Sequence, residues 1–380
     1  MKKAIYIVTA MNAGGAETVF MKFYRKLDRT QYQLDFCVSA EEKGFYDDEI
    51  ESLGGQVVHT VKKSRNPFKS YKRLKDIASE GAYCCAVRSA QNSLSVIDLL
   101  AMKRGGVPKV VLRSSNTGTT DGDALNNVLH RAFKSLATTV PDLCIAPSTE
   151  AGLYMFGARH VKSEEFQVLH NAVDLGEFAY SEQSRAAVRE EFGISSDAPV
   201  VGHVGRFNQQ KNHGFLLEVF AAWLEERPDA VLLLFGDGEC RDDVVKLAKS
   251  LGIVDSVIFA GVRPDVNRCY SAMDTLLFPS LYEGLPNAVI EAQANGLPCL
   301  ISSVITPEVV IGENVHSKSL EDLPEYWAVD LNSLLGQRVS DPAPALRSAG
   351  YDIDEEIHNF IQIVFGEGST EAERQGTIAR

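Results

Sequence analysis

Short apolar runs alternate with longer amphipathic stretches along most of the chain, and the pattern restarts after mid-chain. The runs have strand length and are rich in β-branched and aromatic residues. Such alternation predicts parallel strands joined by crossover helices, a doubly wound α/β arrangement. The predicted strands are residues 4–9, 33–38, 56–61, 83–87, 109–112, 143–146 and 166–169, and then 199–204, 230–235, 256–259, 275–278 and 298–302.

A length of 380 residues exceeds one ordinary core and fits two domains. We place a first Rossmann-like domain at 1–170 and a second at 171–349, with the polar segment 177–189 as the connection into the second. Ligands of such sheets bind at the carboxyl ends of the strands, so two facing sheets would enclose a deep cleft. Residues 352–364 are predicted to form a helix, and the polar segment 366–380 is expected to be a disordered tail.

The charge is distributed unevenly. Residues 1–170 carry +5 and residues 171–380 carry −18, within a total of −13. A positive first half suggests an anionic partner. Nucleic acid is not expected, because the chain has no basic pattern interleaved with stacking aromatics and no recognition helix.

The composition bears on the cellular location. The seven cysteines are an odd number and lack the paired spacing of metal ligands, which favours a reducing cytosol. No apolar run approaches the ~20 residues that span a bilayer, and the chain opens on a short strand instead of a signal peptide. We therefore expect a cytoplasmic protein.

The stretch Glu283-Gly-Leu-Pro-Asn-Ala-Val-Ile-Glu291 carries the most chemistry. A helix is predicted over 288–295, with Pro286 in its first turn. The unpaired N–H groups at its start could hold a phosphate. Glu283 would lie at the mouth, and Glu291 about two turns in on the same side, where the carboxylates could accept hydrogen bonds from polyols. A capped helix with two solvated glutamates is the alternative interpretation.

This stretch resembles the signature of the retaining, nucleotide-sugar-dependent glycosyltransferases of family 4, which have the GT-B fold. Three further matching motifs follow strands in the expected order, and the resemblance covers about residues 1–365. They are Gly14-Gly15-Ala16-Glu17, His170-Asn171-Ala172-Val173-Asp174, and Gly205-Arg206 with Lys211-Asn212. The resemblance also implies that the last helix, within about 350–365, returns to the first domain.

The resemblance implies roles for individual residues. Arg206 and Lys211 would hold the donor diphosphate, since two preorganised cations can stabilise the leaving group without a metal. Glu283 would contact the transferred sugar and Glu291 the ribose. Asn212 is predicted to cap the next helix. The other donor-binding candidates are Gly14, Gly15, Gly205, Gly236, Val262, Gly284, Leu285, Pro286, Asn287 and Ala288.

No cofactor and no metal is implied, and the nucleotide sugar is a substrate. Two Asp-x-Asp pairs, at 121–123 and 352–354, are interpreted as solvated turn or cap residues. The chain departs from the family at Ser115, where many relatives have a histidine near the sugar. Ser115, Asn116 and Asn171 are the candidates for sugar or acceptor contacts.

The segment 62–75 has seven basic residues and no acidic one, with Phe68, Tyr71 and Leu74 at helical spacing. An apolar stripe beside a basic face is typical of a helix that binds an anionic membrane surface. The alternative is a helix that packs this stripe on its own sheet. The membrane candidates are Lys62, Lys63, Arg65, Lys69, Lys72 and Arg73.

We therefore expect a cytoplasmic, membrane-peripheral, retaining glycosyltransferase. It would move a hexose or N-acetylhexosamine from a nucleotide sugar, first of all a UDP-sugar, to a lipid-linked or polysaccharide acceptor in surface-glycan synthesis. Two alternatives stay open. One is other GT-B chemistry on a soluble acceptor, of synthase or epimerase type. The other is a catalytically silent sugar-nucleotide-binding partner protein.

Overall fold

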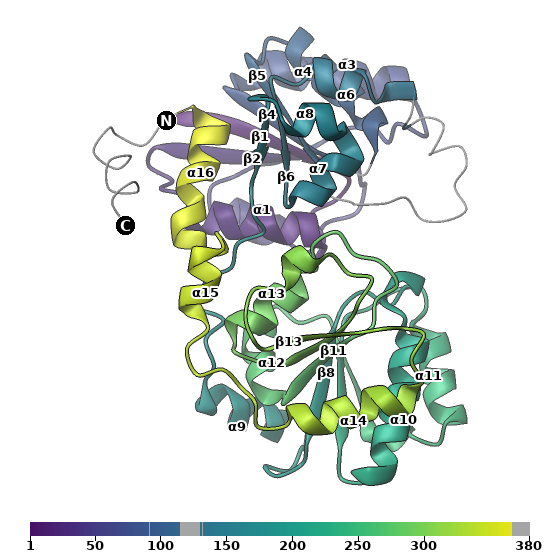
Figure 1. Ribbon diagram of the computed structural model, residues 1–380. Helices are drawn as coiled ribbons and strands as arrows, with labels where there is room; N and C mark the ends of the chain where they lie inside the picture. Colours follow the sequence, from purple (N-terminus) through teal and green to yellow (C-terminus); the bar gives the residue numbers. More distant parts are fainter. Residues whose placement is uncertain (91, 115–129, 131, 367–380) are drawn as a thin grey trace. The chain divides into compact units, whose positions relative to one another are not determined.

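The computed structural model describes residues 1–90, 92–114, 130 and 132–366 (Figure 1). The chain divides into two compact units. The first consists of Met1–Ala172 and the chain from Ile353 on, and the second is Val173–Asp352. The expected tail at 367–380 lies outside the described residues.

The first unit is built on a parallel sheet in the order β3-β2-β1-β4-β5-β6-β7. Every strand predicted for the first half is present, with shifts of a few residues at the ends. The strands are β1 Lys2–Val8, β2 Tyr32–Val38, β3 Val57–His59, β4 Cys85–Ala90, β5 Lys109–Ser114, β6 Leu143–Ala146 and β7 Phe166–Val168.

Helices cover both faces of this sheet and form one core on each face. Side chains along β1 point alternately into these two cores. Tyr6 joins the core under α1 and α16, whereas Ile5 and Ile7 join the core under α3, α4 and α7. The last helix, α16 (yellow in Figure 1), packs on α1 through Phe360, which stacks on Phe23 at 4.6 Å. The prediction of a helix that returns to the first sheet is thus confirmed. The helices are α1 Gly15–Lys26, α2 Asp47–Ser52, α3 Pro67–Gly81, α4 Val96–Arg104, α6 Leu136–Thr139, α7 Thr149–Phe156, α8 Ala158–Val161 and α16 Ile353–Phe365.

The second unit has a parallel sheet in the order β10-β9-β8-β11-β12-β13. The predicted strands are again present, but β13 at the sheet edge was missed, since Val315–Lys318 is short and mostly polar. The strands are β8 Val200–Val204, β9 Val231–Phe235, β10 Val257–Gly261, β11 Thr275–Phe278, β12 Cys299–Ser302 and β13 Val315–Lys318.

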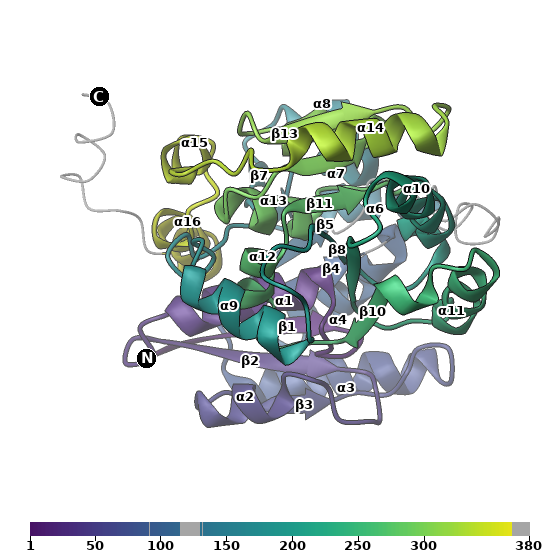
Figure 2. The same cartoon turned by 90° about the horizontal axis from the view of Figure 1, so that it is seen from below.

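Two cores lie on the two faces of the second sheet. One packs under α9, α12 and α13, and the other under α10, α11 and α14 and contains Trp223 and Trp327, which are fully buried. Figures 1 and 2 both show α14 beside α10. The helices are α9 Glu182–Glu191, α10 His213–Glu226, α11 Arg241–Ser250, α12 Val266–Ala272, α13 Asn287–Ala294, α14 Pro324–Leu334 and α15 Ala343–Ser348.

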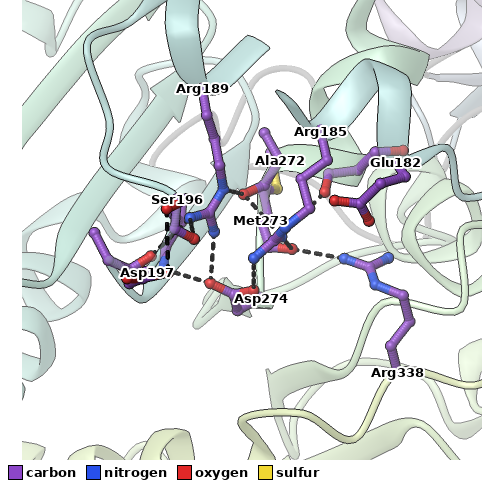
Figure 3. Close-up of polar contacts among 12 residues, drawn as sticks. Glu182, Arg185, Arg189, Ser196, Asp197, Ala272, Met273, Asp274 and Arg338 are labelled. Atoms are coloured by element: carbon purple, nitrogen blue, oxygen red, sulfur yellow. Dashed lines mark hydrogen bonds and ion pairs between the residues drawn. The ribbon is translucent and has the colours of Figure 1, made fainter. Parts of the chain in front are cut away.

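The segment 177–189 is not simply a connection, because most of it belongs to α9. Ser181 caps this helix by accepting a hydrogen bond from the N–H of Ser184. Arg185 and Arg189 then reach from α9 to the Asp274 carboxylate, each at 2.8 Å (Figure 3). This ion-pair cluster fastens α9 to the amino-terminal end of β11.

Candidate functional site

Two glycine loops touch each other at the carboxyl ends of β8 and β9. The N–H of Gly205 donates to the carbonyl of Phe235, and the N–H of Phe207 donates to that of Asp237. A Cβ on Gly236 would lie 2.0 Å from the carbonyl oxygen of Gly205, and the φ of Gly236 is +131°. Only glycine therefore fits at position 236.

Lys211 and Glu283 meet at the centre of the candidate site. Lys211 Nζ lies 2.7 Å from Glu283 Oε1, and both side chains are largely buried, at 15% and 8% exposed. The ammonium also lies 4.5 Å from the centroid of the Phe278 ring, a cation–π contact. Two residues that the sequence nominated separately, 72 positions apart, thus form one charged centre.

Backbone and side-chain hydrogen bonds hold the two loops that carry this pair. The N–H of Leu281 donates to the Gln210 carbonyl at 2.9 Å. The Gln210 side chain donates to the Tyr282 carbonyl at 2.9 Å. Asn212 stands at the helix boundary as predicted, but its side chain donates to the carbonyl of Pro279 and makes no capping bond, so its predicted capping role is wrong.

The second carboxylate, Glu291, is buried at 6% exposed and lies one turn into α13, not two. It accepts a hydrogen bond from Tyr270 Oη at 2.9 Å. Burial and the Glu291 charge raise the pKa of Tyr270 well above its usual value, which keeps the phenol protonated as the donor. Pro286 is the N-cap residue of α13 and not part of its first turn.

Arg206 is exposed and lies near Glu239. Its side chain is 73% exposed, and its Nε lies 3.8 Å from a Glu239 carboxylate oxygen. The structure therefore does not bring Arg206 to the other predicted charged residues. An exposed arginine on a loop can reorient toward a ligand at little cost.

The remaining donor-binding candidates of the second unit border the same strand ends. Leu285, Pro286 and Ala288 are buried at the start of α13, whereas Gly284 and Asn287 are half-buried. Val262 is 48% exposed, just after β10. Its neighbour Arg263 is held by Glu191 and Asp265, so its guanidinium is directed to α9.

In the first unit, Gly14 is the N-cap of α1 and Gly15 begins that helix. A Cβ on Gly14 would lie 2.4 Å from Glu17 Oε2, so the glutamate folds back over this glycine. Asn171 is buried and accepts a hydrogen bond from Arg113 at 2.5 Å. Ser115, Asn116 and the pair Asp121 and Asp123 lie outside the described residues.

Both carboxylates of the second Asp-x-Asp pair form ion pairs. Arg347 Nε lies 2.9 Å from Asp352, which is buried, and Lys26 Nζ lies 2.6 Å from the exposed Asp354. The interpretation as solvated residues is therefore wrong for Asp352. Within the described parts of the chain, no group of three His, Cys, Asp or Glu side chains is placed to hold a metal ion.

The basic segment is helical only from Pro67, where α3 begins with Asn66 as its cap. The predicted apolar stripe is divided, because Leu74 is buried in the first unit's core while Phe68 is 87% exposed. Lys63 Nζ lies 2.7 Å from the buried Asp98 carboxylate. Arg65 pairs with Glu41. Arg73 lies 3.7 Å from Glu80.

Sequence reasoning missed two histidines beneath the site. His203 and His213 are buried, with ring centroids 4.9 Å apart, and His213 stacks on Phe207. Burial, with the Lys211 charge as a second cause, lowers the pKa of His213 to about 4. A lone histidine in an apolar strand gives no sequence signal of function.

This lowered pKa predicts an acid-sensitive second unit. The folded protein keeps His213 neutral, whereas the unfolded chain takes up a proton below pH ~6.5, so stability falls as the pH drops from ~6.5 toward 4. The fall attributable to His213 is about 3 kcal/mol, from the shift between 6.5 and about 4. Urea unfolding followed by tryptophan fluorescence measures it, because Trp223 and Trp327, the only tryptophans, both lie in this unit. His213→Phe should remove that part of the pH dependence, and an unchanged dependence would contradict the assignment.

Known proteins are similar to this chain in sequence and in fold. The family described as Glycosyl transferases group 1 matches residues 184–337. EpsF of Bacillus subtilis (strain 168), a protein named as a glycosyltransferase, is 34% identical over 334 residues, which is 86% of each chain. The chain belongs to the group 1 glycosyltransferases.

Other relatives of this glycosyltransferase extend the comparison. An Escherichia coli protein is 24% identical over 76% of each chain and is named UDP-Gal:alpha-D-GlcNAc-diphosphoundecaprenol alpha-1,3-galactosyltransferase. The structure of Anabaena Alr3699/HepE in complex with UDP-glucose superposes with a TM-score of 0.79 at 17% identity, over 97% of this chain and all of that one. WaaG, a glycosyltransferase involved in lipopolysaccharide biosynthesis, superposes with a TM-score of 0.72 over 96% of this chain and all of that one, also at 17% identity. These likenesses confirm the predicted GT-B fold class.

Among the described residues, no helix is both long and apolar enough to cross a membrane.

Proposed function

We propose that this glycosyltransferase moves a hexose or N-acetylhexosamine from a UDP-sugar, with retention of configuration, to a lipid-linked or polysaccharide acceptor in surface-glycan synthesis. The observation that carries the proposal is the 2.7 Å contact between Lys211 and Glu283. A cation for the leaving diphosphate and a carboxylate for sugar hydroxyls stand side by side at the carboxyl ends of β8 and β11. The names of the relatives support the donor and acceptor classes.

The bond between sugar C1 and the diphosphate oxygen breaks, and its electron pair stays on the diphosphate. The acceptor oxygen bonds to C1 on the same face, and its proton passes to the departing phosphate. Lys211 stabilises the charge that develops on the diphosphate, and Arg206 adds a second cation once it turns from Glu239. We expect transfer to persist in EDTA because these cations supply the charge stabilisation.

The test of this function is transfer to a polyprenyl-diphosphate-linked saccharide, with each common UDP-sugar supplied in turn. Proton NMR of the product gives the configuration at C1. An α-linked product from an α-configured donor is the expected outcome. An inverted product would contradict retention. UDP-sugar binding without transfer to either lipid-linked or soluble saccharides would favour the silent binding protein.

Calorimetry should distinguish the roles of Glu291 and Glu283 in donor binding. Glu291→Ala is expected to weaken UDP binding by ~1–3 kcal/mol, because charge-assisted hydrogen bonds to the ribose are lost. Tyr270→Phe is the matched control, since it removes the phenol that donates to Glu291 and leaves the carboxylate in place.

Glu283→Ala should leave UDP affinity nearly unchanged and lose the additional affinity that the sugar contributes. The measurement is the difference between titrations with UDP and with the UDP-sugar. The reverse pattern in the two glutamate variants would mean that their roles are exchanged.

Membrane binding is the second part of the proposal and rests on the start of α3. Phe68 is exposed beside the exposed basic residues Lys62, Lys69 and Lys72. Lys63 is left out of the surface because it pairs with Asp98. An exposed aromatic ring among lysines suits an anionic lipid surface.

Changing Lys62, Lys69 and Lys72 together to Ser should abolish co-sedimentation with anionic liposomes, since each charge contributes ~1 kcal/mol near such a surface. Phe68→Ser should weaken it without changing its dependence on salt. UDP affinity serves as the control and should be unaltered in both variants. Binding of the triple variant that persists and does not respond to salt would refute the electrostatic account.

A further inference from the structure

Five aromatic rings form a continuous column beneath the loops of the proposed donor site. Each ring centroid lies 4.3–6.2 Å from the next. Lys211 lies over the ring at one end, and Arg241 lies over the ring at the other. In order from the Lys211 end, the column is Phe278, His203, His213, Phe207 and Phe259.

His203 links the two strands that lead to the charged pair. The backbone register between β8 and β11 ends at Gly202 and Leu276. One residue further, His203 Nδ1 lies 2.9 Å from the carbonyl oxygen of Leu277. Because a carbonyl can only accept, Nδ1 carries the proton and donates. The His203 side chain therefore connects β8 to β11 just beyond the end of their backbone pairing.

The other ring nitrogen faces the donor loop. A Cβ on Gly205 would lie 2.8 Å from His203 Nε2 and 3.2 Å from the Cδ and Cε atoms of Lys211. The imidazole edge and the lysine stem thus pack on the same glycine. Among the described residues, His203 Nε2 and both nitrogens of His213 have no hydrogen-bond partner.

Buried polar atoms without partners destabilise a fold, whereas a phenyl ring would fill the same space without that cost. Packing alone therefore does not account for an imidazole ring at this position. Residues that break a local rule of stability are expected at functional sites. The unpartnered Nε2 of His203 packs on the same glycine as the stem of Lys211, the lysine that we assign to the diphosphate.

We propose that His203 is a positioning residue for sugar transfer. By bonding Leu277 and supporting Gly205, it fixes the Lys211 loop against the strand that leads to Glu283. His213 holds the ring of His203 in place from the side opposite Phe278 in the column. This inference rests on the proposed function, since it takes Lys211 as the diphosphate-binding group.

Two amide variants of His203 distinguish the effect of its hydrogen bond to Leu277 from the effect of its ring. His203→Asn places an N–H donor near the position of Nδ1 and should keep UDP affinity and transfer rate within about 3-fold of wild type. His203→Gln places its amide near Nε2 and loses the bond to Leu277. It should weaken UDP binding about 10-fold and slow transfer about 10²-fold, since small misplacements cost rates of that order.

Thr275→Val is the matched control. Thr275 is fully buried at the start of β11, the strand that carries Leu277, and its hydroxyl has no partner among the described residues. This change should leave binding and transfer unaltered. The melting temperature of each variant, read by tryptophan fluorescence, shows whether it is folded.

UDP affinity and transfer rate near wild type in His203→Asn, but not in His203→Gln, would support the positioning role. If wild type binds UDP and Lys211→Ala weakens that binding, a Gln variant with wild-type binding and transfer would overturn the proposal for His203. A folded Asn variant that has lost transfer would also overturn it, even where the Gln variant does not fold. A wild-type protein that binds no UDP would instead overturn the proposed function, and the role of His203 with it.

Discussion

Lys211→Ala is expected to slow sugar transfer by about 10²–10³, the range for removing one preorganised group that stabilises developing charge. The ammonium is largely buried and is held by Glu283 and the Phe278 ring, so it is preorganised before any donor arrives. Its removal also leaves the Glu283 carboxylate without this cation, which adds to the loss.

Steady-state kinetics with the best UDP-sugar measure this effect. Lys249→Ala is a suitable control, because this lysine lies in the last turn of α11 and is exposed. Arg206→Ala should also slow transfer by at least about 10², through loss of the second cation. Turnover near wild type in both Lys211→Ala and Arg206→Ala would remove the basis for the diphosphate assignment.

Asp274→Ala is expected to destabilise the second unit by about 3–5 kcal/mol, the range for breaking a buried ion pair from one side. Its carboxylate accepts hydrogen bonds from Arg185, Arg189 and the N–H of Val200, each at 2.8 Å. Figure 3 shows both arginines converging on it from α9. Without the carboxylate, Arg189, which is 4% exposed, becomes a buried cation that keeps only carbonyl partners.

Urea unfolding followed by tryptophan fluorescence measures this loss in the second unit. Asp243→Ala provides the comparison, because Asp243 forms an exposed pair with Lys246 and should contribute nothing measurable. Equal midpoints for Asp274→Ala and wild type would contradict the role given to the arginine cluster.

The fold could be predicted well because parallel strands that are buried on both faces are continuous apolar runs. Strand β13 escaped the prediction because it is a polar edge strand, and α9 was taken for a connection because it has few apolar residues. Such elements gain their stability from contacts that the local sequence does not show.

The sequence nominated residues for the candidate site but could not predict how they are placed. Motif spacing nominated Lys211 and Glu283, but only the fold brings them to 2.7 Å. Spacing could not tell that Arg206 is directed to Glu239 or that Glu291 is bonded by Tyr270, since these partners lie 21 or more positions away in the chain. Arg206 and Glu239 are 33 residues apart in the chain, and only the fold brings their loops together, through Gly205 and Gly236.

We propose above all that the strand ends of the second unit hold a nucleoside diphosphate at Lys211. The most direct measurement is a calorimetric titration of UDP into the wild-type protein and into Lys211→Ala, with GDP and ADP for comparison. We predict one UDP site per wild-type chain and at least about 10-fold weaker binding by the variant, since a charged hydrogen bond contributes ~1.5–3 kcal/mol. Equal UDP affinity for the two proteins, or no binding of UDP to the wild type, would contradict the account.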